Sequence, residues 1–307
     1  MTDTLAPIVL FVFARPEHTR RTLEALAANL LAKQSDLFVY ADAARDEREV
    51  GRVQAVRSAV HAASGFRSIT VIKRETNYGL ARNIIEGVTE VCNRYGRVIV
   101  LEDDVVTGPY FLSFMNAALD RYVDVTRVWH ISGWSYPIDS SGLGAAFFWR
   151  VMNCWGWATW ADRWKCFQKN PQRLVESWGQ EKIRRFNLDG VHVFWTQITA
   201  NQKGRLNTWA IFWYATIFEN NGLCLNPARS FVRNIGHDGS GENCDYTDSF
   251  AVEQLGSEYA DLPECKEESI VAVQRIKAFY DEIQPPVGQR LIRYFKNLVP
   301  GVIGYRR

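Results

Sequence analysis

Short apolar runs alternate with stretches of helical periodicity through the first third of the chain, and this alternation limits the fold more than any other feature. Four runs have the length of a buried strand, at residues 8–13, 37–40, 69–72 and 98–101. Between them, apolar side chains recur three or four positions apart, at residues 16–31, 50–63 and 80–95. Strands that alternate with helices pair in parallel, so the pattern predicts an α/β fold with a mostly parallel sheet and helices on both faces.

Polar segments follow all four predicted strands. They are residues 14–16, Asp42, residues 77–83 and residues 102–104. Ligands of such sheets bind beyond the carboxyl ends of the strands, so we expect the four segments to meet at one edge.

The last segment, Glu102-Asp103-Asp104, is the most informative of the four. Crowded carboxylates repel one another and are stable mainly when a cation or several donors neutralise them. Oxygen ligands at a strand end suit Mg²⁺ or Mn²⁺, which can also hold a phosphate. The alternative interpretation is a solvated acidic turn.

The rest of the chain predicts mixed elements. Helices are expected at about 110–122, 171–186, 190–203, 209–220 and 267–283, and strands at 128–132, 146–151, 223–225 and 231–232. We expect a main domain over residues 1–250, with one half at 1–106 and the other at 107–250. Residues 251–307 form a helical tail that ends in a basic amphipathic segment.

Composition excludes several classes of protein. The chain has 307 residues, of which 47% are hydrophobic and 23% charged, as in ordinary globular proteins. A net charge of +2 gives no strong field to recruit nucleic acid. No apolar run is long enough to span a membrane, and residues 1–7 lack the features of a signal peptide, so the default expectation is a cytoplasmic protein.

Five sequence blocks, in order and spacing, resemble the GT-A-fold glycosyltransferases, which transfer sugar from a nucleotide-sugar donor. The nearest group is the bacterial polysaccharide glycosyltransferases related to N-acetylglucosaminyltransferase I. The blocks are residues 11–16, 77–83, 101–105, 155–160 and 234–241. The resemblance therefore covers residues 7 to about 245 and implies a Rossmann-like GT-A domain, in which 1–106 is the nucleotide-sugar-binding half and 107–250 the acceptor-side half.

The resemblance implies that Asp104 binds Mn²⁺ or Mg²⁺ as part of a DxD-like motif, and that the ion stabilises the leaving nucleoside diphosphate. Asp103 is then expected near the ribose or diphosphate, and Glu102 near hydroxyls of the donor sugar. The other residues implied in nucleotide-sugar binding are Ala14, Arg15, Pro16, Asp42, Asn77, Gly79, Arg82 and Asn83. Surface salt bridges for Arg15 and Asp42, and simple helix capping for Asn77, are the structural alternatives.

On the acceptor side, the resemblance assigns Trp155, Gly156 and Trp157 to sugar binding, because aromatic rings suit the C–H faces of sugars. The alternative places Trp157, Trp160 and Trp164 in the core at helical spacing. His237 lies in a glycine-rich loop, where it is implied as a second metal or diphosphate contact.

One departure concerns the general base. Inverting relatives carry an aspartate in a block that matches residues 207–213, and here Ala210 occupies the aligned position. Either another carboxylate acts as base, or the enzyme retains anomeric configuration, or the alignment slips by several residues. The candidate carboxylates are Glu219, Asp162, Glu242 and Asp238.

These features predict a metal-dependent glycosyltransferase that moves sugar from a nucleotide-linked donor, UDP-linked on the resemblance, to a hydroxyl of a bacterial surface glycan or lipid-linked oligosaccharide. The alternative is an inactive glycan-binding or assembly protein derived from such an enzyme. Basic and apolar residues interleave over 289–307, which suits peripheral contact with the inner face of the cytoplasmic membrane or, equally, a packed helix with a solvated basic face.

A phosphohydrolase would need a nucleophilic aspartate after the first strand, where this chain has Ala14-Arg15. A Rossmann dehydrogenase would need the G-x-G-x-x-G motif there, and the motif is absent.

Overall fold

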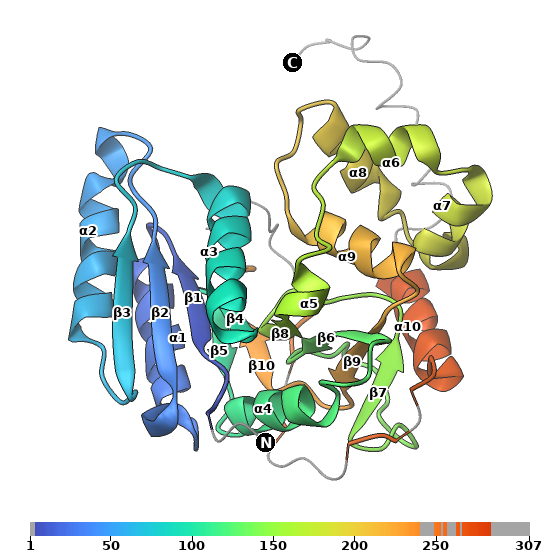
Figure 1. Ribbon diagram of the computed structural model, residues 1–307, viewed down its shortest axis with the longest axis horizontal. Coiled ribbons are helices and arrows are strands. Elements are labelled where there is room, and N and C mark those ends of the chain that lie inside the picture. Colours follow the sequence, from blue (N-terminus) through green and yellow to red (C-terminus); the bar gives the residue numbers. More distant parts are fainter. Residues whose placement is uncertain (1–3, 240–248, 253, 257–261, 265, 284–307) are drawn as a thin grey trace, which may run out of the picture.

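A single eight-stranded sheet forms the centre of the molecule, with helices against it (Figure 1). The computed structural model describes residues 4–239, 249–252, 254–256, 262–264 and 266–283. The strands lie in the order β3-β2-β1-β4-β8-β6-β9-β7. Their bounds are β1 (Ile8–Val12), β2 (Asp36–Ala41), β3 (Ser68–Lys73), β4 (Arg97–Glu102), β6 (Val128–Ser132), β7 (Ala146–Trp149), β8 (Trp157–Trp160) and β9 (Leu223–Pro227).

The first four strands are parallel and are joined by three helices, as the sequence predicts. These helices are α1 (Pro16–Ala27), α2 (Glu47–Ala62) and α3 (Gly79–Tyr95). Their ends follow local chemistry. Pro16 occupies the first turn of α1, the Asp46 carboxylate accepts the N–H of Arg48 at the start of α2, and Gly96 ends α3 with φ 79°.

The strand order reverses between β1 and β4. The chain moves from β1 outward to β2 and β3, and α3 then returns it to β4 on the other side of β1. Right-handed crossovers therefore place α1 and α2 on one face and α3 on the opposite face, in front of the sheet in Figure 1. Such a reversal leaves a crevice beyond the strand ends, which is the preferred ligand position in open α/β sheets.

The second half of the sheet is mixed. Strand β8 lies antiparallel to both neighbours, β4 and β6, whereas β6 and β9 are parallel. The predicted helical spacing of the tryptophans is wrong for Trp157 and Trp160, which lie on strand β8. Both are buried, as is Trp164 on the following short helix, so the core position of all three holds.

The remaining helices are α4 (Phe111–Arg121), α5 (Ala161–Trp164), α6 (Pro171–Ser177), α7 (Gln180–Phe186), α8 (Trp195–Gln202), α9 (Ala210–Glu219) and α10 (Ile270–Ile283), with 3₁₀ turns at Ala32–Gln34 and Leu188–Gly190. In Figure 1, α6, α7, α8 and α9 form a layer at the upper right, whereas α4 lies at the lower edge and α10 at the right. The helix predicted at 171–186 is two helices, interrupted at Trp178 and Gly179.

The predicted C-terminal helix is present as α10, and it packs on the body of the protein. Ala272 and Ile276 are fully buried, and the N–H of Ser269 donates to the Phe148 carbonyl at 2.8 Å. The basic segment 289–307 lies outside the described residues. Among the helices that are described, none has both the length and the apolar character that a membrane crossing needs.

A two-stranded antiparallel sheet completes the fold. Strand β5 (Val105–Thr107), directly after the acidic triplet, pairs with β10 (Val232–Asn234). This mixed α/β architecture, with its parallel N-terminal half, is consistent with a GT-A-like Rossmann fold and confirms the predicted fold class.

Candidate functional site

The polar segments that follow β1, β2, β3 and β4 meet around one cavity of about 300 Å³, here called the strand-end cavity. It lies beyond the reversal of strand order between β1 and β4. Its lining residues are Phe11, Val12, Phe13, Ala14, Arg15, Asp42, Arg45, Glu49, Arg52, Asn77, Gly79, Leu80, Asn83, Glu102, Asp103 and Asp104.

Arg15 joins the end of β1 to the acidic triplet at the end of β4. Its Nη2 atom lies 2.8 Å from Asp104 Oδ2 and also donates to Asp103 Oδ1. Burial alone would lower the pKa of Arg15, but the attraction of the two aspartates outweighs it and raises that pKa. The guanidinium therefore stays charged and neutralises part of the triplet.

The backbone at Ala14 directs Arg15 into the site. Ala14 has φ 45°, in the left-handed region that residues other than glycine rarely adopt, at a cost of roughly 1–2 kcal/mol. Such strain persists only where the surroundings fix the chain, and it occurs often at functional sites. Pro16 then starts α1 but does not line the cavity.

Hydrogen bonds fix both the side chain and the backbone carbonyl of Asp103. Its Oδ2 accepts the N–H of Phe13 at 3.1 Å, and its carbonyl accepts the hydroxyl of Thr22 at 2.8 Å. Burial raises the pKa of Asp103 to about 7, against the opposing effect of Arg15.

Glu102 differs from its neighbours because its carboxylate has no hydrogen bond or ion pair to any described residue. Burial, together with repulsion from Asp104 and Asp103, raises the pKa of Glu102 to about 8. The triplet thus offers one carboxylate that protein groups leave available within the cavity.

The glycine-rich loop returns to this point because β10 pairs with β5. Asn234 lies opposite Val105, and the N–H of Ile235 donates to the Asp104 carbonyl at 2.8 Å. At Gly236 an added Cβ would overlap the Asp104 carboxylate, with Asp104 Cγ only 2.9 Å away. Only glycine fits there, so the loop packs directly on Asp104.

On the other side of the cavity, Asp42 fixes the loop before α3. Its carboxylate accepts three backbone N–H groups at 2.9 Å, from Ala43, Tyr78 and Gly79. With 4% of its surface exposed, Asp42 is a buried structural anchor that also lines the cavity. The idea that it reads a nucleobase stays a prediction.

Of the other residues predicted in this loop, Asn77 and Asn83 line the cavity and Arg82 does not. Asn77 donates to the Ala43 carbonyl at 2.7 Å rather than capping α3, and Asn83 accepts from Arg74 at 2.9 Å; both line the cavity. Arg82 lies outside the cavity lining, with its guanidinium 3.8 Å from the Tyr78 ring centroid and bonded to Glu86.

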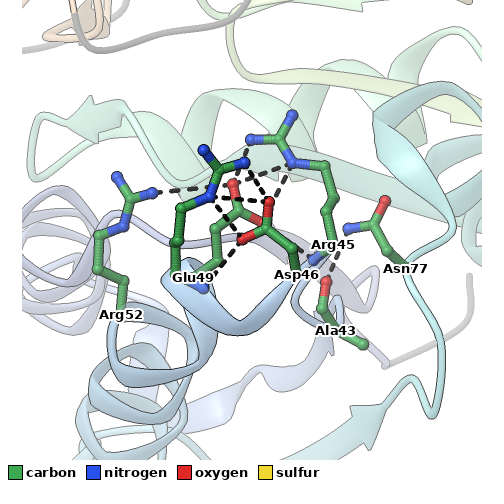
Figure 2. A network of polar contacts seen from close by, with 7 residues as sticks. Ala43, Arg45, Asp46, Glu49, Arg52 and Asn77 are labelled. Carbon is green, nitrogen blue, oxygen red and sulfur yellow. Dashed lines mark hydrogen bonds and ion pairs between the residues drawn. The ribbon is translucent and has the colours of Figure 1, made fainter.

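Sequence reasoning missed a charged cluster at the start of α2. Figure 2 shows Glu49 between Arg45 and Arg52, with Asn77 turned toward Ala43. Arg45 also lies over the ring of Phe13, 5.2 Å from its centroid, and both arginines are at least half exposed. In the sequence these charges look like the solvated face of a helix; their position one turn after a strand end was the only signal.

The acceptor-side residues lie apart from the strand-end cavity. Trp155 packs edge-to-face on His237, with centroids 5.2 Å apart, and lines a second cavity. Gly156 adopts φ 62° and lies close to Phe111 and Val232, so a side chain is excluded there. Trp157 is fully buried and lines neither cavity, so it takes the core position that was the alternative to sugar binding.

The candidate bases are dispersed. Glu219 is held by Arg173, Trp178 and Lys182, whose hydrogen bonds outweigh burial and lower its pKa to about 2. Asp162 is half exposed and pairs with Arg163.

The remaining two lie in or near the glycine-rich loop. Asp238 lies 3.1 Å from His18, and Glu242 is outside the described residues. Neither Glu219 nor Asp162 lines either cavity, whereas Ala210 lines the second one.

The residues fit a divalent ion of the magnesium type, held through few protein ligands. Among the described residues no group of three His, Cys, Asp or Glu side chains forms a ready metal cage. Asp103 is already bonded at both oxygens and Asp104 at Oδ2, so the Glu102 carboxylate and the second oxygen of Asp104 remain for a cation. Mg²⁺ is commonly bound by one or two carboxylates together with substrate phosphates and water, which matches this arrangement.

Fold and site together define an α/β protein of GT-A-like architecture with an acidic triplet at its topological switch point. No protein-family model matches the sequence, and no curated protein does either. Among solved structures, the chain is similar to the crystal structure of S. aureus TarS residues 1–349, with 10% identity and a TM-score of 0.43. The match covers 75% of this chain and 60% of that one, so the chain spans about three fifths of the length of that TarS fragment. A likeness this distant carries no functional argument.

Proposed function

We propose that this protein is a glycosyltransferase that uses a nucleotide-sugar donor and a hydroxyl acceptor on a glycan. The observation that carries the proposal is the contact of Arg15 with Asp103 and Asp104 at the floor of the strand-end cavity. A cationic group and available carboxylates at a switch point suit a charged diphosphate bound together with a cation.

Different residues of the chain are proposed to contact different parts of the donor. Arg15 presents positive charge to a phosphate, while Asp42 holds the loop 77–79 in place through backbone N–H groups. Arg45 and Arg52 add positive charge at the cavity wall, and the exposed guanidinium of Arg45 can stack on a base or pair with phosphate.

We propose that Asp104 holds Mn²⁺ or Mg²⁺ with help from Glu102, and that His237 is an additional ligand. When bound, the ion would neutralise charge on the departing nucleoside diphosphate. The support for His237 is that the preceding residue, Gly236, packs directly on the Asp104 carboxylate.

The acceptor-activating base is not assigned. Glu219, with its pKa near 2, is a poor proton acceptor at neutral pH. Product stereochemistry, measured by proton NMR of the anomeric signal, would separate an inverting enzyme, which needs a base, from a retaining one.

The test is a thermal-shift and calorimetric screen of UDP-, GDP-, CMP- and dTDP-sugars, each with and without Mn²⁺ or Mg²⁺. We expect a UDP-sugar to stabilise the protein in a metal-dependent way, and Asp104→Asn to abolish that dependence. Asp120→Asn is the matched control, because Asp120 is 61% exposed and pairs only with Arg97 among the described residues.

If no nucleotide sugar binds, the proposal is wrong. If one binds but neither transfer nor slow donor hydrolysis follows with any glycan tested, the chain is instead an inactive, glycan-binding descendant.

A lipid-linked acceptor and membrane contact through residues 289–307 are also part of the proposal, and they rest on the sequence pattern alone. Co-sedimentation with anionic vesicles tests this, with and without those residues. Binding that is unchanged by their removal would refute the membrane role.

A further inference from the structure

A second cavity, of about 290 Å³, lies on the acceptor side of the molecule and is here called the aromatic cavity. Its walls are mostly rings, contributed by Trp134, Tyr136, Trp155, Phe194, Tyr214 and Tyr280. None of the described residues that line it is Asp, Glu, Lys or Arg. This size is near the lower limit of small-molecule sites, which span ~300–1,000 Å³.

Three of the lining residues carry a buried polar nitrogen that has no hydrogen-bond partner among the described residues. These are Trp134 Nε1, Asn153 Nδ2 and His192 Nδ1. Buried polar groups are nearly always paired in folded proteins, so three unpaired nitrogens on residues that line one cavity indicate that something else satisfies them. Trp134 itself is only 2% exposed.

The hydroxyl pair formed by Tyr136 and Tyr280, 2.7 Å apart, adds a polar point to the same wall. Burial lowers the pKa of His192 to about 4, so its imidazole is neutral at physiological pH. The cavity thus combines aromatic faces, neutral hydrogen-bonding groups and no formal charge.

We propose that the aromatic cavity binds one uncharged sugar ring of the acceptor glycan. The C–H faces of a sugar pack on aromatic rings, and its hydroxyls satisfy buried N–H groups. An alkyl chain would leave those groups unpaired, and an acidic sugar would bury a charge with no counter-ion. That this sugar belongs to the acceptor rests on the proposed function; the binding of a neutral sugar does not.

The cavity is close to the acidic triplet through a short chain of contacts. Trp155, on its wall, packs on His237, and the preceding Gly236 lies against Asp104. The aromatic cavity and the Asp104 carboxylate are thus linked through Trp155, His237 and Gly236.

The test is saturation-transfer NMR on the full chain with methyl glycosides of neutral hexoses, deoxyhexoses and N-acetylhexosamines, with and without UDP. Methyl glucuronide and octanol serve as the charged and apolar probes. We expect at least one neutral glycoside to bind and both other probes to fail.

Trp134→Phe keeps an aromatic ring but removes the N–H, and His192→Phe removes the imidazole. Each should weaken binding of the glycoside by about 2- to 10-fold, the effect of one lost hydrogen bond. Trp160→Phe is the control, because Trp160 is equally buried but lines neither cavity. It should bind the glycoside as the unaltered chain does.

Binding of a UDP-sugar is measured in parallel and should be unchanged by Trp134→Phe. If no protein, altered or unaltered, binds the UDP-sugar while the glycoside still binds, the proposed function is wrong but the sugar site stands. If no neutral glycoside binds, if octanol or the glucuronide binds better, or if Trp134→Phe and His192→Phe bind normally, the sugar site is refuted.

Discussion

Removing the Arg15 guanidinium should destabilise the protein more than any other single change at the strand-end cavity. In Arg15→Met the stem of the side chain remains, but Asp103 and Asp104 lose their shared cation. Their side chains are 5% and 9% exposed, so water can compensate little. Breaking a buried ion pair from one side costs ~3–5 kcal/mol. Arg15 retains 19% exposure, which favours the lower value of ~3 kcal/mol.

The assay is chemical denaturation at pH 7.5 with thermal melts in parallel. A loss of ~3 kcal/mol should lower Tm by about 5 °C for a chain of this length. Arg20→Met, on the helix that follows Arg15, is the matched control, because Arg20 is half exposed and its ion pairs with Glu17 and Glu24 lie on the surface. It should melt as the unaltered protein does.

A double variant separates charge from packing. Asp103→Asn in the Arg15→Met background replaces one unpaired carboxylate with a neutral amide, so it should restore part of the lost stability. If Arg15→Met melts like Arg20→Met, or if adding Asp103→Asn destabilises the protein further, then Arg15 does not neutralise the triplet and the argument for the site fails.

Three further predictions concern other positions. Gly236→Ala should cost ~1–3 kcal/mol in denaturant melts and weaken nucleotide-sugar binding, since its Cβ overlaps the Asp104 carboxylate; Gly51→Ala, with open space around it, should be harmless. Burial lowers the pKa of His130 from 6.5 to about 3, so the unfolded chain binds the proton first, and the free energy of unfolding should fall as pH drops from 6.5 toward 3; a pH series in which His130→Gln shows the same slope would contradict this. Glu219→Gln should destabilise at pH 7, but the difference should vanish as pH falls from 4.5 through 2, because the folded-state pKa is depressed; a gap that persists at pH 2 would refute the ion-pair explanation.

The parallel half of the fold was predictable because its periodicity is strong and local. Strands at 8–13 and 98–101 and the helix at 80–95 match β1, β4 and α3 to within a residue or two. Strand β8 was missed because it has four residues, is buried on both faces and shows no alternation. Its insertion between β4 and β6 depends on tertiary pairing that local sequence does not encode.

The candidate site, like the fold, was predictable from the sequence only in part. The rule that ligands bind at strand ends correctly brought Arg15, Asn77 and the acidic triplet to one cavity. It could not show that backbone N–H groups occupy the Asp42 carboxylate, nor that Arg45 reaches the cavity from the loop just before α2. Those facts depend on loop geometry and on which face of a helix turns inward.

The antiparallel pairing of β5 with β10 also constrains when the site can be completed during synthesis. Arg15 and the triplet leave the ribosome early, yet the segment that packs on Asp104 lies some 130 residues later, at Gly236. Until then the carboxylates lack one wall. Contacts so distant in sequence form late and slowly. The nascent chain therefore carries an unfinished anionic pocket while the residues between Asp104 and Gly236 are added.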